Sequence, residues 1–118
     1  MIGKILELDE RSLPVSSARA TGGTCTAIFE PVPSDRWWLV DRLVVSCTST
    51  TPTTAYVYDD IPGPNALLGG TSSGNFDFDD TNNPYWIEAS RQLRVVWVGA
   101  SAGSIGTVRA HYRVLTAA

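Results

Sequence analysis

Alternating apolar and polar residues mark the longest regular stretch of the chain, residues 37–48. Leu39, Leu43 and Val45 fall on its odd-numbered row, and the even-numbered row mixes polar and apolar side chains. A period of two is typical of a β-strand with one face on a core, and the stretch is rich in residues that favour extended backbone. Because the run is longer than a usual strand, we predict a central strand that bends near Asp41.

Two further alternating segments, residues 92–98 and 107–115, flank a glycine-containing turn near the end of the chain. Two strands joined in this way predict a β-hairpin, which would place Arg94 opposite His111. Together with residues 37–48, these segments supply most of the predicted core. The residues expected to point inward are Leu39, Leu43, Val45, Leu93, Val95, Trp97, Val108, Ala110, Tyr112 and Val114.

Shorter strand-like segments, separated by turns that contain proline or glycine, fill the rest of the chain, and no convincing helix is found. They lie at residues 24–30, 54–58, 66–68, 76–79 and 85–89. Many short strands with regularly spaced turns predict an all-β fold, here an antiparallel β-sandwich. The long central strand and the irregular loops favour a jelly-roll-like sandwich over an immunoglobulin-type one.

Residues 1–22 are predicted to form an extended N-terminal arm, and residues 23–118 the β-sandwich domain. Pro14 and the small polar residues after it are expected to stop regular structure. The arm carries apolar side chains that need cover, either from its own domain or from a neighbouring molecule, and both alternatives stay open. These candidate interface residues are Ile2, Ile5, Leu6 and Leu8.

The length of 118 residues and the net charge of −3 restrict the classes of function. The length fits one domain that needs no metal or disulfide. An acidic chain argues against a nucleic-acid partner, and no apolar run is long enough to cross a bilayer. The acidic N-terminus does not resemble a signal peptide, so we expect synthesis in the cytoplasm. Cys25 and Cys47 are expected to be buried thiols, with a disulfide as the open alternative.

Motifs for catalysis or cofactor binding are weak, and we predict no enzyme and no cofactor. The single histidine, His111, lies in mid-strand between two arginines and far from any nucleophile motif. No pair of carboxylates is singled out for glycoside hydrolysis. Acidic residues at 59–60 and 77–80 offer oxygen ligands for Ca²⁺, but a role as solvated turn residues is the favoured interpretation.

Two groups of outward residues are candidate contact sites. The first is a basic row, which suits charge-complementary association, although a solvated sheet face is the alternative. It comprises Arg42, Arg94, Arg109, His111 and Arg113. The second is a set of aromatic residues that, if exposed, can stack on sugars or anchor a protein contact, with partial burial under loops as the alternative. It comprises Trp38, Tyr58 and Trp86.

Three segments, residues 36–45, 55–58 and 92–100, together resemble small β-sandwich structural proteins of tailed phages, and the likeness extends over residues 24–115. The resemblance implies a non-enzymatic virion protein. It favours a capsid decoration (cement) protein that binds and stabilises the head shell, with the major capsid protein or another virion protein as partner. We also expect a homo-oligomer, for example a trimer. The alternative is a carbohydrate- or receptor-binding module of a tail fibre or tail tip.

Overall fold

The computed structural model describes residues 5–60, 67–71, 76–79 and 84–117. Within these residues every regular element is a β-strand and no helix occurs, so the all-β prediction is confirmed. The strands are β1 (Ile5–Ser16), β2 (Thr24–Ile28), β3 (Trp37–Cys47), β4 (Thr54–Asp59), β5 (Leu67–Thr71), β6 (Phe76–Asp79), β7 (Tyr85–Ile87), β8 (Leu93–Val98) and β9 (Gly106–Ala117).

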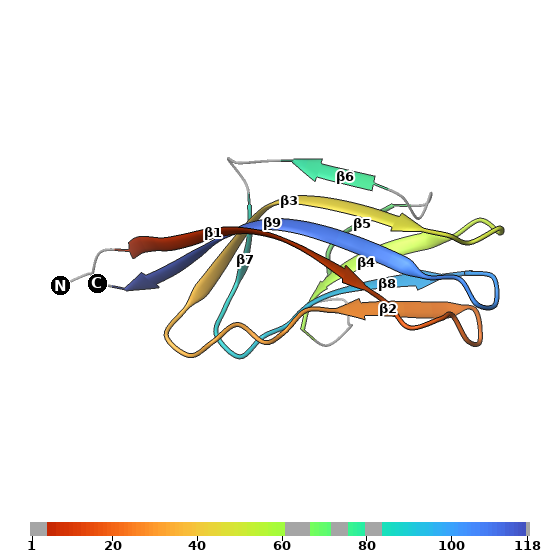
Figure 1. Cartoon of the computed structure of the whole chain (residues 1–118), viewed down its shortest axis with the longest axis horizontal. Helices are drawn as coiled ribbons and strands as arrows, with labels where there is room; N and C mark the ends of the chain where they lie inside the picture. The colour runs from red at the N-terminus through yellow and green to blue at the C-terminus, as the bar shows by residue number, and fades with distance from the viewer. Residues whose placement is uncertain (1–4, 61–66, 72–75, 80–83, 118) are drawn as a thin grey trace.

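The strands form two antiparallel sheets that pack face to face (Figure 1). The five-stranded sheet has the order β1-β9-β3-β6, with β7 also paired to β3, and the four-stranded sheet has the order β2-β8-β4-β5. The chain thus pairs its first strand with its last, its second with the next to last, and so on inward to β4 with β5. This nested pairing is the arrangement of a jelly roll, as the sequence predicted.

A β-bulge at Asp41 interrupts β3, where the register against β9 shifts. The extra residue reverses the alternation of the strand, so that Trp38 and Val40 contribute to the core before the bulge and Leu43 after it. The predicted bend is therefore confirmed. The predicted inward orientation of Leu39 is wrong, because this residue precedes the bulge and lies on the outer face, where neighbouring residues still cover it.

The remaining predicted core residues are confirmed. Val114 is half-buried against the core, and the others are buried within it. They are Leu43, Val45, Leu93, Val95, Trp97, Val108, Ala110 and Tyr112.

The predicted hairpin between β8 and β9 is wrong. β8 pairs with β2 and β4, whereas β9 pairs with β1 and β3, so the two strands lie in opposite sheets (Figure 1). Their apolar rows face each other across the core instead of sharing one face. A Cβ atom on Gly106 would lie 2.3 Å from the buried ring of Trp97, so only glycine lets β9 approach this ring so closely.

β1 is the edge strand of the five-stranded sheet and pairs with β9 along its whole length, from Ile5 opposite Ala117 to Ser16 opposite Thr107. The expectation that Pro14 stops regular structure is wrong, because an edge strand can hold a proline whose missing N–H has no partner strand to bond. The division of the chain into residues 1–22 and 23–118 stays a prediction, which a truncation tests.

Candidate interaction surfaces

His111 lies on the outer face of the five-stranded sheet between two carboxylates. Its Nδ1 is 2.6 Å from Asp41 Oδ1 in β3, and its Nε2 is 2.9 Å from Glu10 Oε1 in β1. The hydrogen bond to Asp41 is the main cause that raises the pKa of His111 above its ordinary value, and the charges of Asp41 and Glu10 add to it. A protonated His111 donates to both acids and so connects the three strands β1, β9 and β3.

The bulge explains why Asp41 is available to His111. Asp41 is buried, and a buried carboxylate is costly unless it is paired. The imidazole of His111 provides that pairing. Sequence alternation alone placed Asp41 on the inward row, so this ion pair was not predicted.

Four members of the predicted basic row lie on the five-stranded sheet, namely Arg42, Arg109, His111 and Arg113. Arg42 is in register with His111 across β3 and β9, and the Arg109 guanidinium donates to Ser12 Oγ at 3.1 Å. The fifth member, Arg94, lies on β8 in the other sheet. Its predicted position opposite His111 is therefore wrong, and the cause is the incorrect hairpin. A partner contact by the basic row stays a prediction.

The three candidate stacking aromatics have different environments. Trp86 on β7 is 47% exposed, and Tyr58 on β4 is half-buried beside Tyr56, with ring centroids 6.2 Å apart. Trp38 is buried and stacks on Tyr112 at a centroid distance of 4.2 Å. An exposed stacking role for Trp38 is therefore wrong, because the bulge turns its row toward the core.

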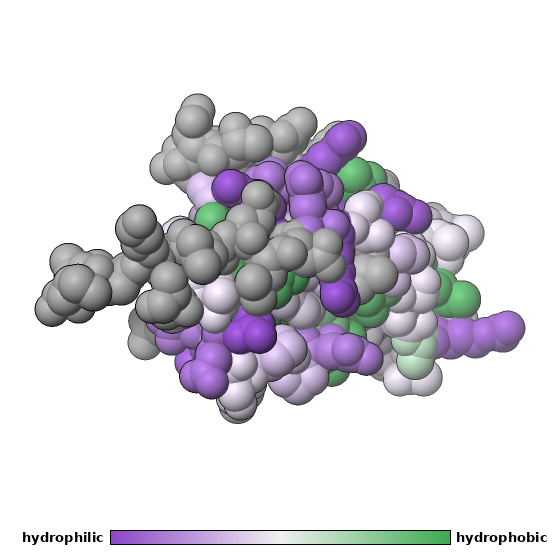
Figure 2. Space-filling model, turned by 60° about the vertical axis from the view of Figure 1, so that its left-hand side comes forward, coloured by the Kyte–Doolittle hydropathy of each residue, from purple (hydrophilic) through white to green (hydrophobic). Residues whose placement is uncertain are grey.

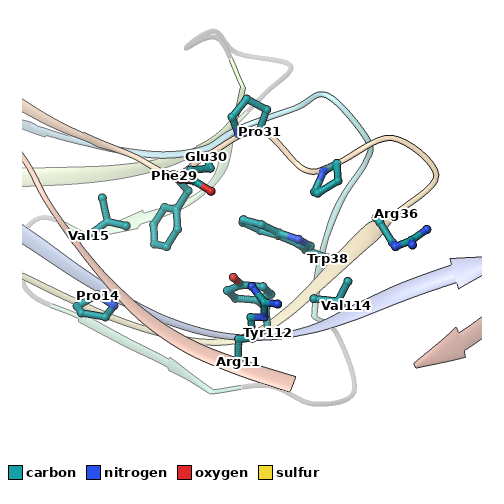
Figure 3. Close-up of a pocket in the computed structure, with 11 residues that line it drawn as sticks. Arg11, Pro14, Val15, Phe29, Glu30, Pro31, Arg36, Trp38, Tyr112 and Val114 are labelled. Carbon is teal, nitrogen blue, oxygen red and sulfur yellow. The ribbon is translucent and has the colours of Figure 1, made fainter. Parts of the chain in front are cut away.

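A cleft of about 490 Å³ opens beside the Trp38–Tyr112 stack, between β1 and the proline-containing segment that joins β2 to β3 (Figure 3). Phe29 packs edge-on against Trp38, and Arg11 and Arg36 line the cleft as well. The aromatic residues that line the cleft, Phe29, Trp38 and Tyr112, are almost fully buried, so none of them offers an open face for stacking. Sequence patterns gave no signal for it, because it forms where β2 ends and the chain crosses between the sheets.

Large apolar residues are exposed on both sheets. In the view of Figure 2, hydrophobic residues are interspersed with hydrophilic ones. The exposed residues are Ile28, Val44, Leu67, Trp86 and Val98. Three of these belong to the four-stranded sheet, namely Ile28, Leu67 and Val98.

The N-terminal residues predicted to contact a partner fall largely outside the described part. Ile2 lies outside the described residues. The backbone of Ile5, Leu6 and Leu8 belongs to β1, but their side chains are likewise outside the described part. Their role as an interface stays a prediction.

Cys25 and Cys47 are free thiols. Burial raises the pKa of the Cys25 thiol, and the nearby Cys47 adds to this effect, although a hydrogen bond with Ser17 opposes it. Cys25 therefore stays protonated near neutral pH, as expected for a buried structural thiol.

The acidic residues of the loops are partly engaged. Asp59 pairs with Arg91 at 3.0 Å, and Asp60 accepts a hydrogen bond from the backbone N–H of Gln92 at 3.3 Å. Asp80 and the side chains of Asp77 and Asp79 lie outside the described residues.

In the described ranges no three His, Cys, Asp or Glu residues cluster as metal ligands do. The same residues contain no helix that could span a membrane.

Comparison with known proteins identifies a similar fold in a viral capsid. No protein-family model and no curated protein sequence matches the chain. The fold is similar to that of a chain in the acidic stable capsid structure of Helicobacter pylori bacteriophage KHP30, with a TM-score of 0.61 and 9% sequence identity. The similarity covers 95% of this chain and 93% of that chain, so the two share a fold over nearly their whole length.

Two enzymes show weaker likenesses, with TM-scores too low to indicate a shared fold. An aminopeptidase of a marine sediment Thaumarchaeota archaeon has a TM-score of 0.34 at 9% identity, and the match covers 82% of this chain and 26% of the enzyme. An α-amino acid ester hydrolase has a TM-score of 0.29 at 11% identity, and the match covers 81% of this chain and 26% of the enzyme.

Proposed function

We propose that the protein is a non-enzymatic structural component of a phage capsid. The observation that carries the proposal is the fold similarity to the KHP30 capsid chain, which covers 95% of this chain and 93% of that chain. The resemblance of the sequence to structural proteins of tailed phages supports the same function from separate evidence. On this proposal the protein is located in the virion and its partners are other virion proteins.

The environment of the single histidine supports a structural rather than a catalytic role. Both ring nitrogens of His111 lie within hydrogen-bonding distance of a carboxylate. Such a histidine is already used to join strands, and its raised pKa favours the protonated form over the form that can accept a proton.

Within the capsid, we assign the protein to decoration of the head shell. The jelly roll encloses its own apolar core, including Trp97 and Tyr112, so the domain needs no partner in order to fold. Its exposed apolar residues and arginines are distributed over both outer faces, which suits several small contacts rather than one large one. A shell repeats each weak contact many times, so the assembled coat gains strength through multivalency.

The test is a binding experiment with particles of the virus whose genome encodes the chain. Purified full-length protein is added to particles prepared without it, the particles are pelleted, and bound protein is located by gold labelling in electron micrographs. The proposal expects saturable labelling on the heads. Labelling confined to tails would overturn the decoration role, and no binding to particles would overturn the capsid role. Sedimentation of the free protein tests the expected homo-oligomer.

A carbohydrate- or receptor-binding module of a tail fibre is the second candidate, and the exposure of Trp86 favours it. An exposed indole offers a stacking face for a sugar ring. The test is a glycan array probed with the wild-type protein and with Trp86→Ala. Specific glycan binding that is lost in the variant would favour this function over decoration.

A further inference from the structure

The outer face of the four-stranded sheet carries three of the five large apolar residues that are exposed in the described part of the chain. Its register aligns Ile28, Arg94, Tyr58 and Leu67 in one row across β2, β8, β4 and β5. The next row along the strands includes Tyr56, and the last includes Val98. We call these six residues, Ile28, Tyr56, Tyr58, Leu67, Arg94 and Val98, the Arg94 face.

Apolar and aromatic side chains make up most of the Arg94 face. Ile28 is 43% exposed, and Leu67 and Val98 are each 47% exposed. Tyr56 and Tyr58 lie side by side next to them. Tyrosine and arginine are enriched at protein interfaces, and the buried core of an interface is more apolar than its rim.

Arg94 lies in the middle of this apolar row, between Ile28 and Tyr58. The other charged residue of these four strands in the described part is Asp59 at the end of β4, which pairs with Arg91 instead of Arg94. The Nε of Arg94 is excluded from solvent, and no acceptor for it occurs among the described residues. No ion pair of Arg94 is found within that part of the chain either. The buried Nε is out of reach of a partner, but the guanidinium is not paired with a carboxylate in the described parts of the domain, so its remaining N–H groups can bind a carboxylate of another protein.

Charge argues against a symmetric dimer centred on Arg94 as the occupant of this face. In a two-fold dimer the same surface meets itself, so two Arg94 side chains would approach each other with no carboxylate between them. A different protein surface that presents a carboxylate among apolar side chains satisfies both the cation and the exposed apolar residues.

We propose that the Arg94 face docks on an acidic patch of a neighbouring capsid protein, with a carboxylate of that protein bound to the Arg94 guanidinium. This inference rests on the proposed function and names the surface through which the contact is made. Strand spacing gives the four strands a width of roughly 15 Å, which is smaller than the face of a typical stable interface. A single contact of this size is weak, and repetition around a shell makes it durable.

The experiment measures binding of full-length variants to particles that lack the protein. Arg94→Glu is expected to weaken binding by about 30-fold or more, because it replaces the cation with a charge that repels the partner carboxylate. Ile28→Lys, at an exposed position, is expected to weaken it by about tenfold or more, because it places a charge in the apolar contact. Arg19→Glu, at an exposed position in the segment between β1 and β2, is the matched control and is expected to bind like the wild type.

Thermal melts check that each variant is folded. Three results then distinguish a failure of the docking surface from a failure of the proposed function and from a wrong partner. If Arg94→Glu melts like the wild type and binds as tightly, the Arg94 face is not the docking surface, while the capsid function stands. If the wild-type protein does not bind particles, the proposed function fails and this inference fails with it. If sedimentation shows a dimer that Arg94→Glu dissociates, the occupant is a second copy, which overturns the acidic partner.

Discussion

The two outer faces of this sandwich differ in whether their central basic residue is paired with a carboxylate of the domain. On the five-stranded sheet, His111 lies between Asp41 and Glu10, so charges from three strands pair within the domain. On the four-stranded sheet, Arg94 lies among exposed apolar and aromatic residues and forms no ion pair within the described residues, where Asp59 pairs with Arg91. One face therefore contributes to the stability of the domain, and the other is available for a contact that the domain does not make by itself.

The comparison shows that a basic residue cannot be assigned a role from its strand alone. Arg94 and His111 both occupy outward positions of alternating strands, and the sequence grouped them into one row. Their environments differ: Arg94 belongs to the Arg94 face, whereas His111 links β1, β9 and β3 through its two carboxylate partners.

Deleting residues 1–16 should have the largest effect, because it removes β1 and with it Glu10. The deletion leaves the long edge of β9 unpaired, and we expect a loss of about 5 kcal/mol or more, which approaches the whole stability of a small domain. Circular dichroism melts measure the effect, with deletion of residues 1–4 as the control that keeps β1. A truncated protein that melts like the intact chain would instead support a separable N-terminal arm.

Gly106→Ala should disturb the packing that holds the two sheets together. The new Cβ would lie 2.3–2.6 Å from three ring carbons of the fully buried Trp97, and overpacking of this kind costs about 1–3 kcal/mol. Urea denaturation measures the loss. The double variant with Trp97→Phe lacks the clashing ring, so the cost of Gly106→Ala should shrink in that background. An equal cost in both backgrounds would refute the close contact.

Asp41→Asn should destabilise the five-stranded face by about 1–3 kcal/mol at about pH 6, because it removes a buried hydrogen bond between charged groups. Chemical denaturation of the variant and the wild type gives the difference. Arg42→Gln, a neighbouring change on the outer face, is the control and should cost less. A cost that is the same at low and high pH would show that the His111 charge is not involved.

The stability of the wild-type protein should fall as pH rises above the ordinary pKa of histidine, 6.5. The pKa of His111 is raised in the folded state, mainly by the hydrogen bond to Asp41. Its contribution is therefore complete below the unfolded pKa and is lost as pH rises through the folded pKa. Melting temperatures from about pH 6 to about pH 9 measure this fall, and His111→Gln should abolish it. A wild-type profile without this fall would contradict the ion pair.

Leu67→Ser and Arg94→Gln should change stability least, within about 0.5 kcal/mol, because both residues belong to a surface that the isolated domain does not use. Thermal denaturation of the free protein measures this. A loss above about 2 kcal/mol for either change would show that the Arg94 face also stabilises the domain.

The sequence pattern predicted which residues are buried between the sheets better than it predicted which strands pair with each other. The apolar rows with Leu43, Val95 and Val108 identified the core because burial follows the two-residue period of a strand. The same rows could not show that β8 and β9 face each other, since a hairpin and a pair across the core satisfy the same alternation. The strand pairing distinguishes the two, and Gly106 allows the close approach of β9 to Trp97 across the core.

The candidate sites were predicted less well because they depend on local irregularity. The bulge at Asp41 turned Trp38 into the core and brought Asp41 to His111. Two outward residues had a signal in the sequence, Arg94 through its charge on an alternating strand and Trp86 through its place on a short strand. The neighbours of each residue depend on the sheet to which its strand belongs. Sheet membership is set by pairing between strands that are far apart in the sequence, so the local pattern does not show it.

The most direct test of the account is a cryo-electron microscopy reconstruction of the virion at a resolution that separates the two sheets. We predict the jelly roll at symmetry-related positions on the head, with the outer face of the four-stranded sheet against a neighbouring protein and a carboxylate of that protein at Arg94. A reconstruction that places the domain on the tail, or that leaves the Arg94 face open to solvent, would contradict the account.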